Sequence, residues 1–230
     1  MRFSMSLFSS IGKKLFMGLS GLMLSGFIVV HLLGNLALLN PDRDPFNKYA
    51  HFLTHGLGNA IYVAEFLLAA IFLIHFFYAI AVTWGNWKAR PVRYAKVTNA
   101  GGASRKSIAS TTMIYGGLLI IIFTIMHLFH FKFGEVIMYT TKDGQVIRDL
   151  YAVVYQFFGN IWNTLFYIVV MVVLGFHLSH GFWSAFQSLG LNGKRFTPFI
   201  QGFGYLFAVV MGIGFVWLPF YIYYLRGGAQ

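Results

Sequence analysis

The sequence contains no cysteine and few charged residues, and both shortages exclude whole classes of protein. Without cysteine, the chain can form no disulfide, no Cys-ligated zinc site, no iron–sulfur cluster and no covalently attached c-type haem. Charged residues make up 10% of its 230 residues, against about 25% in a typical soluble domain. Six Asp and Glu residues cannot build a solvated surface on a chain that is 58% hydrophobic, so a soluble protein is excluded.

Five apolar runs are long enough to cross a bilayer, which takes about 20 residues in a helix. They cover 15–39, 60–85, 111–133, 161–189 and 201–225. None of them shows the alternation of polar and apolar residues that is typical of barrel strands. The sequence therefore predicts an all-α membrane protein in which five transmembrane helices form a bundle, with 1–230 as a single transmembrane domain.

The basic residues predict how the helices are oriented. One set of helix ends carries eleven basic residues and no acid: Arg2, Lys13, Lys14, Lys88, Arg90, Arg93, Lys96, Arg105, Lys106, Lys194 and Arg195. The opposite ends carry six basic residues together with five acids. Because Lys and Arg accumulate on the cytoplasmic side, the first set is expected to be cytoplasmic, in a multi-pass protein of a prokaryotic cytoplasmic membrane. The N-terminus then lies inside and the C-terminus outside, and the net charge of +11 indicates membrane topology rather than nucleic-acid binding.

Six of the eight histidines fall inside the expected spans: His31, His75, His127, His130, His177 and His180. Ionisable side chains at membrane depth are costly and are by default functional candidates, although a histidine can also bond to a neighbouring helix. Four different helices supply these six residues. Since neutral imidazole is an axial ligand of haem iron, two facing helices with one histidine each could hold a b-type haem.

Counting residues from the basic anchors places the histidines at two depths. His31 lies 17 residues after Lys14, about 25 Å from the inner ends. His127 lies 21 residues after Lys106, about 31 Å away, and His130 lies about 36 Å away. We therefore expect His31 and His127 to form an outer pair of ligands.

The remaining histidines lie closer to the cytoplasmic ends. His75 precedes Lys88 by 13 residues, roughly 20 Å, while His180 and His177 precede Lys194 by 14 and 17 residues. The inner pair is then His75 with either His177 or His180, and the count slightly favours His180. The two pairs predict two stacked b-type haems that carry electrons across the bilayer.

Small residues precede three of these histidines by eleven positions, which is about three helical turns. They are Ser20, Ala64 and Gly116. Small side chains there could leave room for a porphyrin at the other level. Ordinary helix packing also favours such residues, and Phe166 breaks the pattern in the fourth span.

The segments around the histidines resemble the cytochrome b subunit of succinate dehydrogenase and fumarate reductase, in the form with five helices, two haems and one membrane anchor. The matching segments are VHLLGN at His31, YAHFLTH at His51, LIHFFYA at His75, MHLFHF at His127 and FHLSHGFWSAF at His177. The resemblance covers nearly the whole chain. It implies His31, His75, His127 and His177 as the axial ligands, while His130 and His180 are histidines that some relatives lack.

The resemblance also implies the role of the chain. It would be the membrane anchor of a succinate:quinone oxidoreductase, an enzyme of the respiratory chain and the tricarboxylic acid cycle. A flavoprotein and an iron–sulfur subunit would dock on the cytoplasmic face, and the anchor would pass electrons through two haem b groups to a quinone, expected to be menaquinone. The active site for succinate would lie in the partners, which agrees with the lack of cysteine and of a dinucleotide fingerprint here.

Two other functions remain open from the sequence. One is the di-haem cytochrome subunit of another quinone-linked complex, such as a formate dehydrogenase or hydrogenase, although those proteins lack the Gly-x-Trp-Ser element after the fourth ligand. The other is a transporter with a histidine proton relay, which a broken or inverted-repeat helix would favour; the sequence shows none.

Glu65 is the only acid within an expected span, and it marks a candidate quinone site. It precedes His75 by ten residues, which places it about 15 Å nearer the outer face. Asn35, His51 and His55 lie near the same side. These groups could bind quinone carbonyls and carry the protons that quinone chemistry takes up or releases. The alternative is that Glu65 bonds a neighbouring helix and that His51 and His55 belong to a solvated loop.

Overall fold

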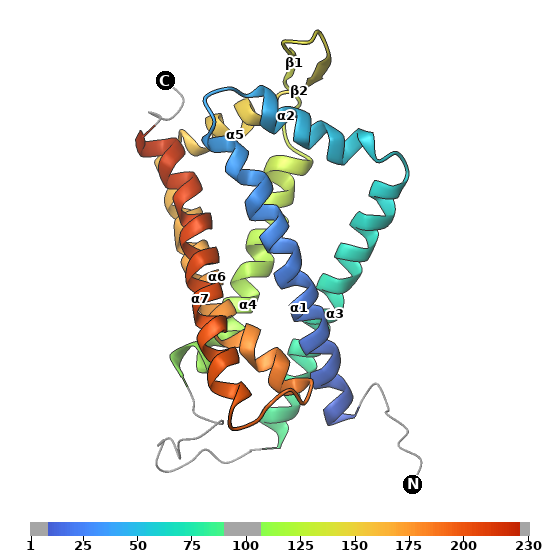
Figure 1. Ribbon diagram of the computed structural model, residues 1–230, viewed down its shortest axis with the longest axis vertical. Helices are drawn as coiled ribbons and strands as arrows, with labels where there is room; N and C mark the ends of the chain where they lie inside the picture. The colour runs from blue at the N-terminus through green and yellow to red at the C-terminus, as the bar shows by residue number, and fades with distance from the viewer. Residues whose placement is uncertain (1–8, 90–106, 226–230) are drawn as a thin grey trace. The chain divides into compact units, whose positions relative to one another are not determined.

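The computed structural model describes residues 9–89 and 107–225, and within them five long apolar helices carry the chain. These helices are α1 (Ser10–Asn35), α3 (Ala60–Lys88), α4 (Ile108–His127), α6 (Ile161–Ser188) and α7 (Phe196–Phe220) (Figure 1). Each is long and apolar enough to cross a membrane, so the expected all-α architecture with five such helices is confirmed. Most of the basic loop expected at 86–110 lies outside the described residues.

Three of the long helices continue past their α-helical part into a tighter or wider turn. A 3₁₀ turn, η1 (Leu36–Leu39), follows α1, and π turns follow α4 (η4, Leu128–Lys132) and α7 (η5, Tyr221–Leu225). Pro219 lies one residue before the end of α7, and because proline has no N–H, the regular hydrogen-bond ladder cannot continue there unchanged.

The connections between the long helices carry short elements of their own. They are α2 (Asp44–His51), the π turn η2 (Phe52–Gly56), the strands β1 (Met138–Thr140) and β2 (Val146–Arg148), and α5 (Leu150–Phe158). The two strands pair antiparallel, with Tyr139 opposite Ile147. The connection between α1 and α3 and the connection between α4 and α6 thus each contain a short helix, and the hairpin in the second was not predicted.

The chain divides into two compact units, and each long helix contributes residues to both. Unit 1 comprises 1–26, 68–118 and 176–209, and unit 2 comprises 27–67, 119–175 and 210–230. Unit 1 therefore contains the helix ends that the basic residues predict to be cytoplasmic. His75 and His177 belong to unit 1, while His31 and His127 belong to unit 2.

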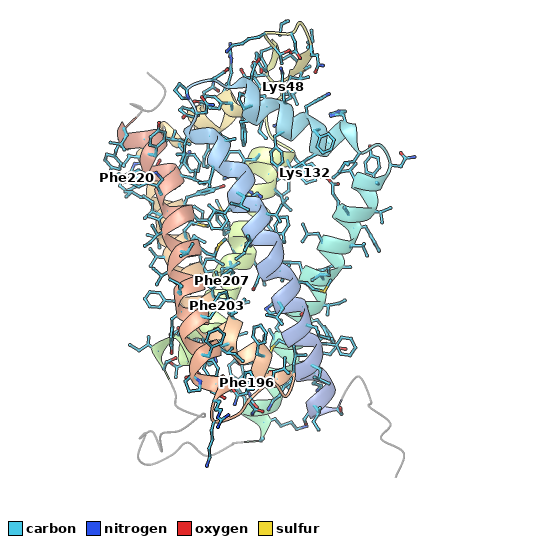
Figure 2. All side chains as sticks on the ribbon, viewed as in Figure 1. Lys48, Lys132, Phe196, Phe203, Phe207 and Phe220 are labelled. Carbon is cyan, nitrogen blue, oxygen red and sulfur yellow. The ribbon has the colours of Figure 1, made fainter. Side chains whose placement is uncertain are left out.

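Small residues and aromatic rings pack the helices together within each unit. In unit 1 a side chain at Gly18 of α1 would lie 3.3 Å from the carbonyl of Ala185 on α6, and Phe182 of α6 packs on Phe207 of α7 at 4.6 Å. Phe207 and its neighbour Phe203 are labelled in Figure 2. In unit 2 a side chain at Gly212 would lie 3.5 Å from the Cα of Gly175. Such small residues let membrane helices approach closely.

A polar cluster in unit 2 joins α2 to the hairpin and to the start of α5. The Asp149 side chain is 1% exposed, yet its carboxylate accepts hydrogen bonds from Arg43 Nη1 at 2.6 Å, Asn47 Nδ2 at 2.7 Å and the Ala152 amide at 3.1 Å. The last bond caps α5. Because the buried charge is fully hydrogen-bonded, its burial is tolerated.

The hairpin is attached to α2 by a second set of polar contacts. Tyr139 donates to Asp44 Oδ1 at 2.7 Å, and this bond, with one from the Lys142 amide at 3.0 Å, lowers the pKa of Asp44. Lys48, which is labelled on α2 in Figure 2, lies 2.9 Å from Asp143 in the hairpin loop. Charged contacts therefore hold the hairpin on α2.

Three tyrosine hydroxyls bond to consecutive carbonyls at the end of η1, the 3₁₀ turn that continues α1. Tyr155 donates to the carbonyl of Leu38 at 2.9 Å, Tyr221 to that of Leu39 at 3.2 Å and Tyr151 to that of Asn40 at 3.1 Å. The last carbonyls of a helix have no partner within it, so these bonds complete the end of the first span.

Candidate functional site

The two histidines of the outer pair face each other in unit 2. His31 of α1 and His127 at the end of α4 have ring centres 5.7 Å apart, with their planes at 81°. Phe27 stacks on His31 at 5.4 Å, and Phe123 lies 5.5 Å from His127. Aromatic neighbours on the same helices therefore restrict how both imidazoles can rotate.

The two histidines of the inner pair face each other in unit 1. His75 of α3 and His177 of α6 have ring centres 6.4 Å apart, with their planes at 69°. His75 Nδ1 lies 3.2 Å from the Met17 carbonyl and 3.3 Å from Ser20 Oγ, both on α1. A side chain at Gly117 of α4 would lie 3.6 Å from Cε1 of His177. Four helices thus contribute to this site.

His130 and His180 have other neighbours. His130 lies in η4, where its Nδ1 is 3.3 Å from the Tyr167 hydroxyl and its ring packs on Phe157 at 4.4 Å. The His180 ring packs edge-on against Trp183 at 5.2 Å. The ring of His75 therefore lies against that of His177. His177 is the partner that the resemblance implied, whereas the count of residues from the basic anchors slightly favoured His180.

Both histidine pairs fit an iron that needs two axial ligands. Two imidazole nitrogens bound to opposite sides of one metal, each at about 2 Å, would hold the ring centres roughly 6 Å apart, close to the spacing in both pairs. Nδ1 of His127 and Nδ1 of His177 are buried and have no hydrogen-bond partner within 9–89 and 107–225. A buried ring nitrogen without a partner is costly, and in the described residues these two rings are not held by a hydrogen bond to Nδ1.

The surroundings suit a haem better than a bare metal ion. In the described part of the chain, no group of three or more His, Cys, Asp and Glu residues could hold a metal ion. A structural or catalytic metal site usually takes three or four protein ligands, whereas a haem iron takes two because the porphyrin supplies the others. Pairs of histidines among aromatic and small residues therefore match a haem.

The candidate quinone residues form separate local contacts. Glu65 makes an ion pair with Lys132 of η4, and the two side chains are 38% and 39% exposed. The rings of His51 and His55 stack at 4.6 Å. Asn35 donates from its side chain to the backbone carbonyl of His31 at 2.8 Å, which places its amide one turn beyond the outer pair. A bond from Glu65 to a neighbouring helix was the expected alternative, and this ion pair is such a contact.

Ser20 and a neighbouring glycine have contacts that the sequence did not reveal. Ser20, proposed as a small residue that leaves room for a porphyrin, reaches the ring of His75 through its hydroxyl. A side chain at Gly21 would lie 3.2 Å from Cε1 of the same ring. These contacts join residues more than 50 positions apart, so no local pattern could have indicated them. Gly116, another of the three candidate small residues, immediately precedes Gly117, where an added side chain would lie 3.6 Å from His177 Cε1.

If the inner pair holds a haem, we expect Gly21→Ala to lower the haem content of that pair, because the new methyl group would push the His75 ring out of position. Haem per protein, measured on the purified variant, tests this. Gly26→Ala is the matched control, since a side chain there would meet nothing within 4 Å and should leave both haems in place. Equal haem content in both variants would contradict the expectation.

No protein-family model, curated protein or solved structure matches this chain.

Proposed function

We propose that this chain is the di-haem cytochrome b membrane anchor of a succinate:quinone oxidoreductase. The observation that carries the proposal is the pairing of His31 with His127 and of His75 with His177, each pair with ring centres about 6 Å apart and each in a different compact unit. The family resemblance supplies the identity of the complex. Haem iron, when bound, provides one-electron transfer between the soluble partners and a membrane quinone.

The residues of the chain have three tasks in this proposal. The four histidines hold the two groups, each pair by one ring from each of two helices. Aromatic neighbours such as Phe27 and Phe123 restrict how the rings of the outer pair can rotate. Glu65, His51 and His55 would hold or move protons where a quinone reacts. In this proposal the flavoprotein and iron–sulfur partners would carry out the chemistry on succinate.

An absorption spectrum and a haem assay of the purified complex test the cofactor part of the proposal. We expect two haem b groups per chain, with a low-spin spectrum that changes on reduction. A protein purified from its native membrane without haem would refute the proposal. The identity of the subunits that purify with the chain tests which complex it belongs to. We expect a flavoprotein that oxidises succinate. Subunits of a formate dehydrogenase or hydrogenase would instead favour the alternative quinone-linked complex.

We expect the loop after α6 to face the cytoplasm and the hairpin loop to face outward, because the basic residues collect on the side of the former. The chain has no cysteine, so single cysteines can be introduced at the exposed positions Asn192 and Gln145. In intact cells a membrane-impermeant thiol reagent should label Gln145→Cys and spare Asn192→Cys. Permeabilised cells should show labelling at both positions. Labelling of Asn192→Cys alone from outside would reverse the orientation.

A further inference from the structure

His75 has a hydrogen-bonding arrangement on α1 that fixes the position of its ring proton. Its Nδ1 lies 3.2 Å from the backbone carbonyl of Met17. A carbonyl oxygen can only accept, so Nδ1 must carry the hydrogen in this bond. Nε2 is then the nitrogen whose lone pair is free for a ligand.

Ser20 provides a second acceptor for the same N–H. Its hydroxyl lies 3.3 Å from His75 Nδ1 and donates its own proton to the carbonyl of Phe16 at 2.6 Å. Since the proton of the hydroxyl is used on its own helix, a lone pair of Oγ remains for His75. Ser20 is 4% exposed, so water does not compete strongly for this bond.

The backbone of α1 also limits where the His75 ring can go. A Cβ atom at Gly21 would lie 3.2 Å from Cε1 and 3.5 Å from Nδ1 of His75. The distance to Cε1 is shorter than an ordinary van der Waals contact. Met17, Ser20 and Gly21 therefore hold one edge of the imidazole. In contrast, Nδ1 of His177 has no hydrogen-bond partner within the described part of the chain, so the two ligands of the inner pair are held differently.

We propose that Ser20 is a positioning residue for His75. Together with the Met17 carbonyl, Ser20 holds His75 in the tautomer that presents Nε2 to the iron, and its hydrogen bond increases electron donation from the imidazole ring. This inference rests on the proposed haem function. A hydrogen bond accepted from the remote N–H of a metal-bound imidazole makes the ring a stronger donor and fixes its orientation. Stronger donation stabilises the ferric state, so the haem held by His75 is harder to reduce than it would be without Ser20.

The test compares three serine variants in the intact complex. Ser20→Ala removes the hydroxyl and Ser20→Thr keeps it. Ser25→Ala removes a hydroxyl of α1 that is also buried but whose hydrogen bond goes to the carbonyl of Gly21 on the same helix, at 2.8 Å. Each variant is assayed for haem per protein and titrated with a redox mediator while the low-spin spectra of the two haems are followed. The inner haem is identified as the one lost in His75→Ala.

We expect Ser20→Ala to keep two haems while the inner haem becomes easier to reduce. At the potential at which the wild-type inner haem is half reduced, the variant's inner haem should be mostly reduced, with a ratio of reduced to oxidised form that rises up to about tenfold. The lost bond acts only through the difference between its strengths in the ferric and ferrous states, so the strength of one net hydrogen bond sets the upper limit. The outer haem, and both haems of Ser25→Ala, should titrate as in the wild type. Ser20→Thr should restore the wild-type behaviour of the inner haem. Selective loss of the inner haem in Ser20→Ala, with rescue by Thr, would also support a positioning role.

Other outcomes separate this inference from the proposed function. Two haems with an unchanged inner titration in Ser20→Ala, or equal changes in Ser20→Ala and Ser25→Ala, would overturn the role of Ser20 and leave the haem function intact. A Ser20→Thr variant as defective as Ser20→Ala would overturn it too, because packing would then explain the effect. A wild-type complex without haem would overturn both.

Discussion

Replacing His177 with alanine should remove the inner haem and leave the outer one in place. His177 faces His75 in unit 1 with ring centres 6.4 Å apart, and a haem that keeps only one of its two protein ligands loses its low-spin six-coordinate state or dissociates. Haem per protein should fall from two to about one, and His75→Ala should behave alike. His31→Ala and His127→Ala should instead remove the outer haem. Pyridine haemochrome assays and low-temperature spectra of the four variants measure this.

The chain provides a matched control for each pair. His180 lies three residues after His177 and packs against Trp183, while His130 lies three residues after His127 and contacts Tyr167. His180→Ala and His130→Ala should therefore retain two haems with wild-type spectra. If His177→Ala kept both haems and His180→Ala lost one, the ligand of α6 would have to be reassigned to His180.

Replacing Glu65 with glutamine should reduce quinone-linked turnover by about tenfold or more, because the carboxylate that is proposed to carry protons at an outer quinone site would be lost. Both haems should remain, because the ion-pair partner of Glu65 is Lys132, which belongs to neither histidine pair. Succinate oxidation with an artificial dye, which bypasses the quinone, should be unchanged. Turnover with quinone and turnover with the dye are measured on the same preparation.

Lys132→Gln separates a proton-carrying role from a structural one. It breaks the same ion pair but keeps the carboxylate, and because both side chains are more than one third exposed, the pair itself contributes little to stability. We expect Lys132→Gln to keep quinone turnover close to that of the wild type, whereas Glu65→Gln loses it. Equal losses in the two variants would show that the ion pair matters rather than proton transfer. A quinone bound at the cytoplasmic helix ends would exclude an outer site altogether.

The long helices could be predicted from the sequence because a membrane leaves the backbone few alternatives. Twenty or more apolar residues must satisfy their N–H and C=O groups internally, so the apolar runs indicate the helices directly. Their ends were less accurate: α1 begins at Ser10 and α7 at Phe196, each five residues before the expected span. Both beginnings contain residues that are polar or aromatic and therefore lie outside a purely apolar run.

Depth along a helix could be counted, whereas rotation about its axis could not. A rise of about 1.5 Å per residue gives the height of a histidine within about a turn, but His177 and His180 differ in direction by about 60° and only slightly in height. Which of them faces His75 depends on how α3 and α6 pack. The π turn after His127 adds a further rotation before His130 that composition does not reveal.

Contacts between distant residues were the least predictable. The strands of the hairpin have three residues each, too few for a pattern, and the Asp149 cluster joins positions more than 100 residues apart. The bond between Ser20 and His75 is of the same kind. The sequence indicated that Ser20 is small and lies in a span, but its hydroxyl gains a role only from the neighbouring helix.

The three tyrosines that bond to Leu38, Leu39 and Asn40 determine more than the end of a span. A helix that slips by one residue turns by about 100° and moves by about 1.5 Å. Such a slip in the first span would break all three bonds at once, and the donors Tyr151, Tyr155 and Tyr221 come from two further segments of unit 2. His31 lies about two turns before these carbonyls, so the same bonds oppose any twist that would turn its ring away from His127. The axial register of the first helix is thus locked from the outer loops, and an alteration far from any histidine could loosen a ligand by letting that helix rotate.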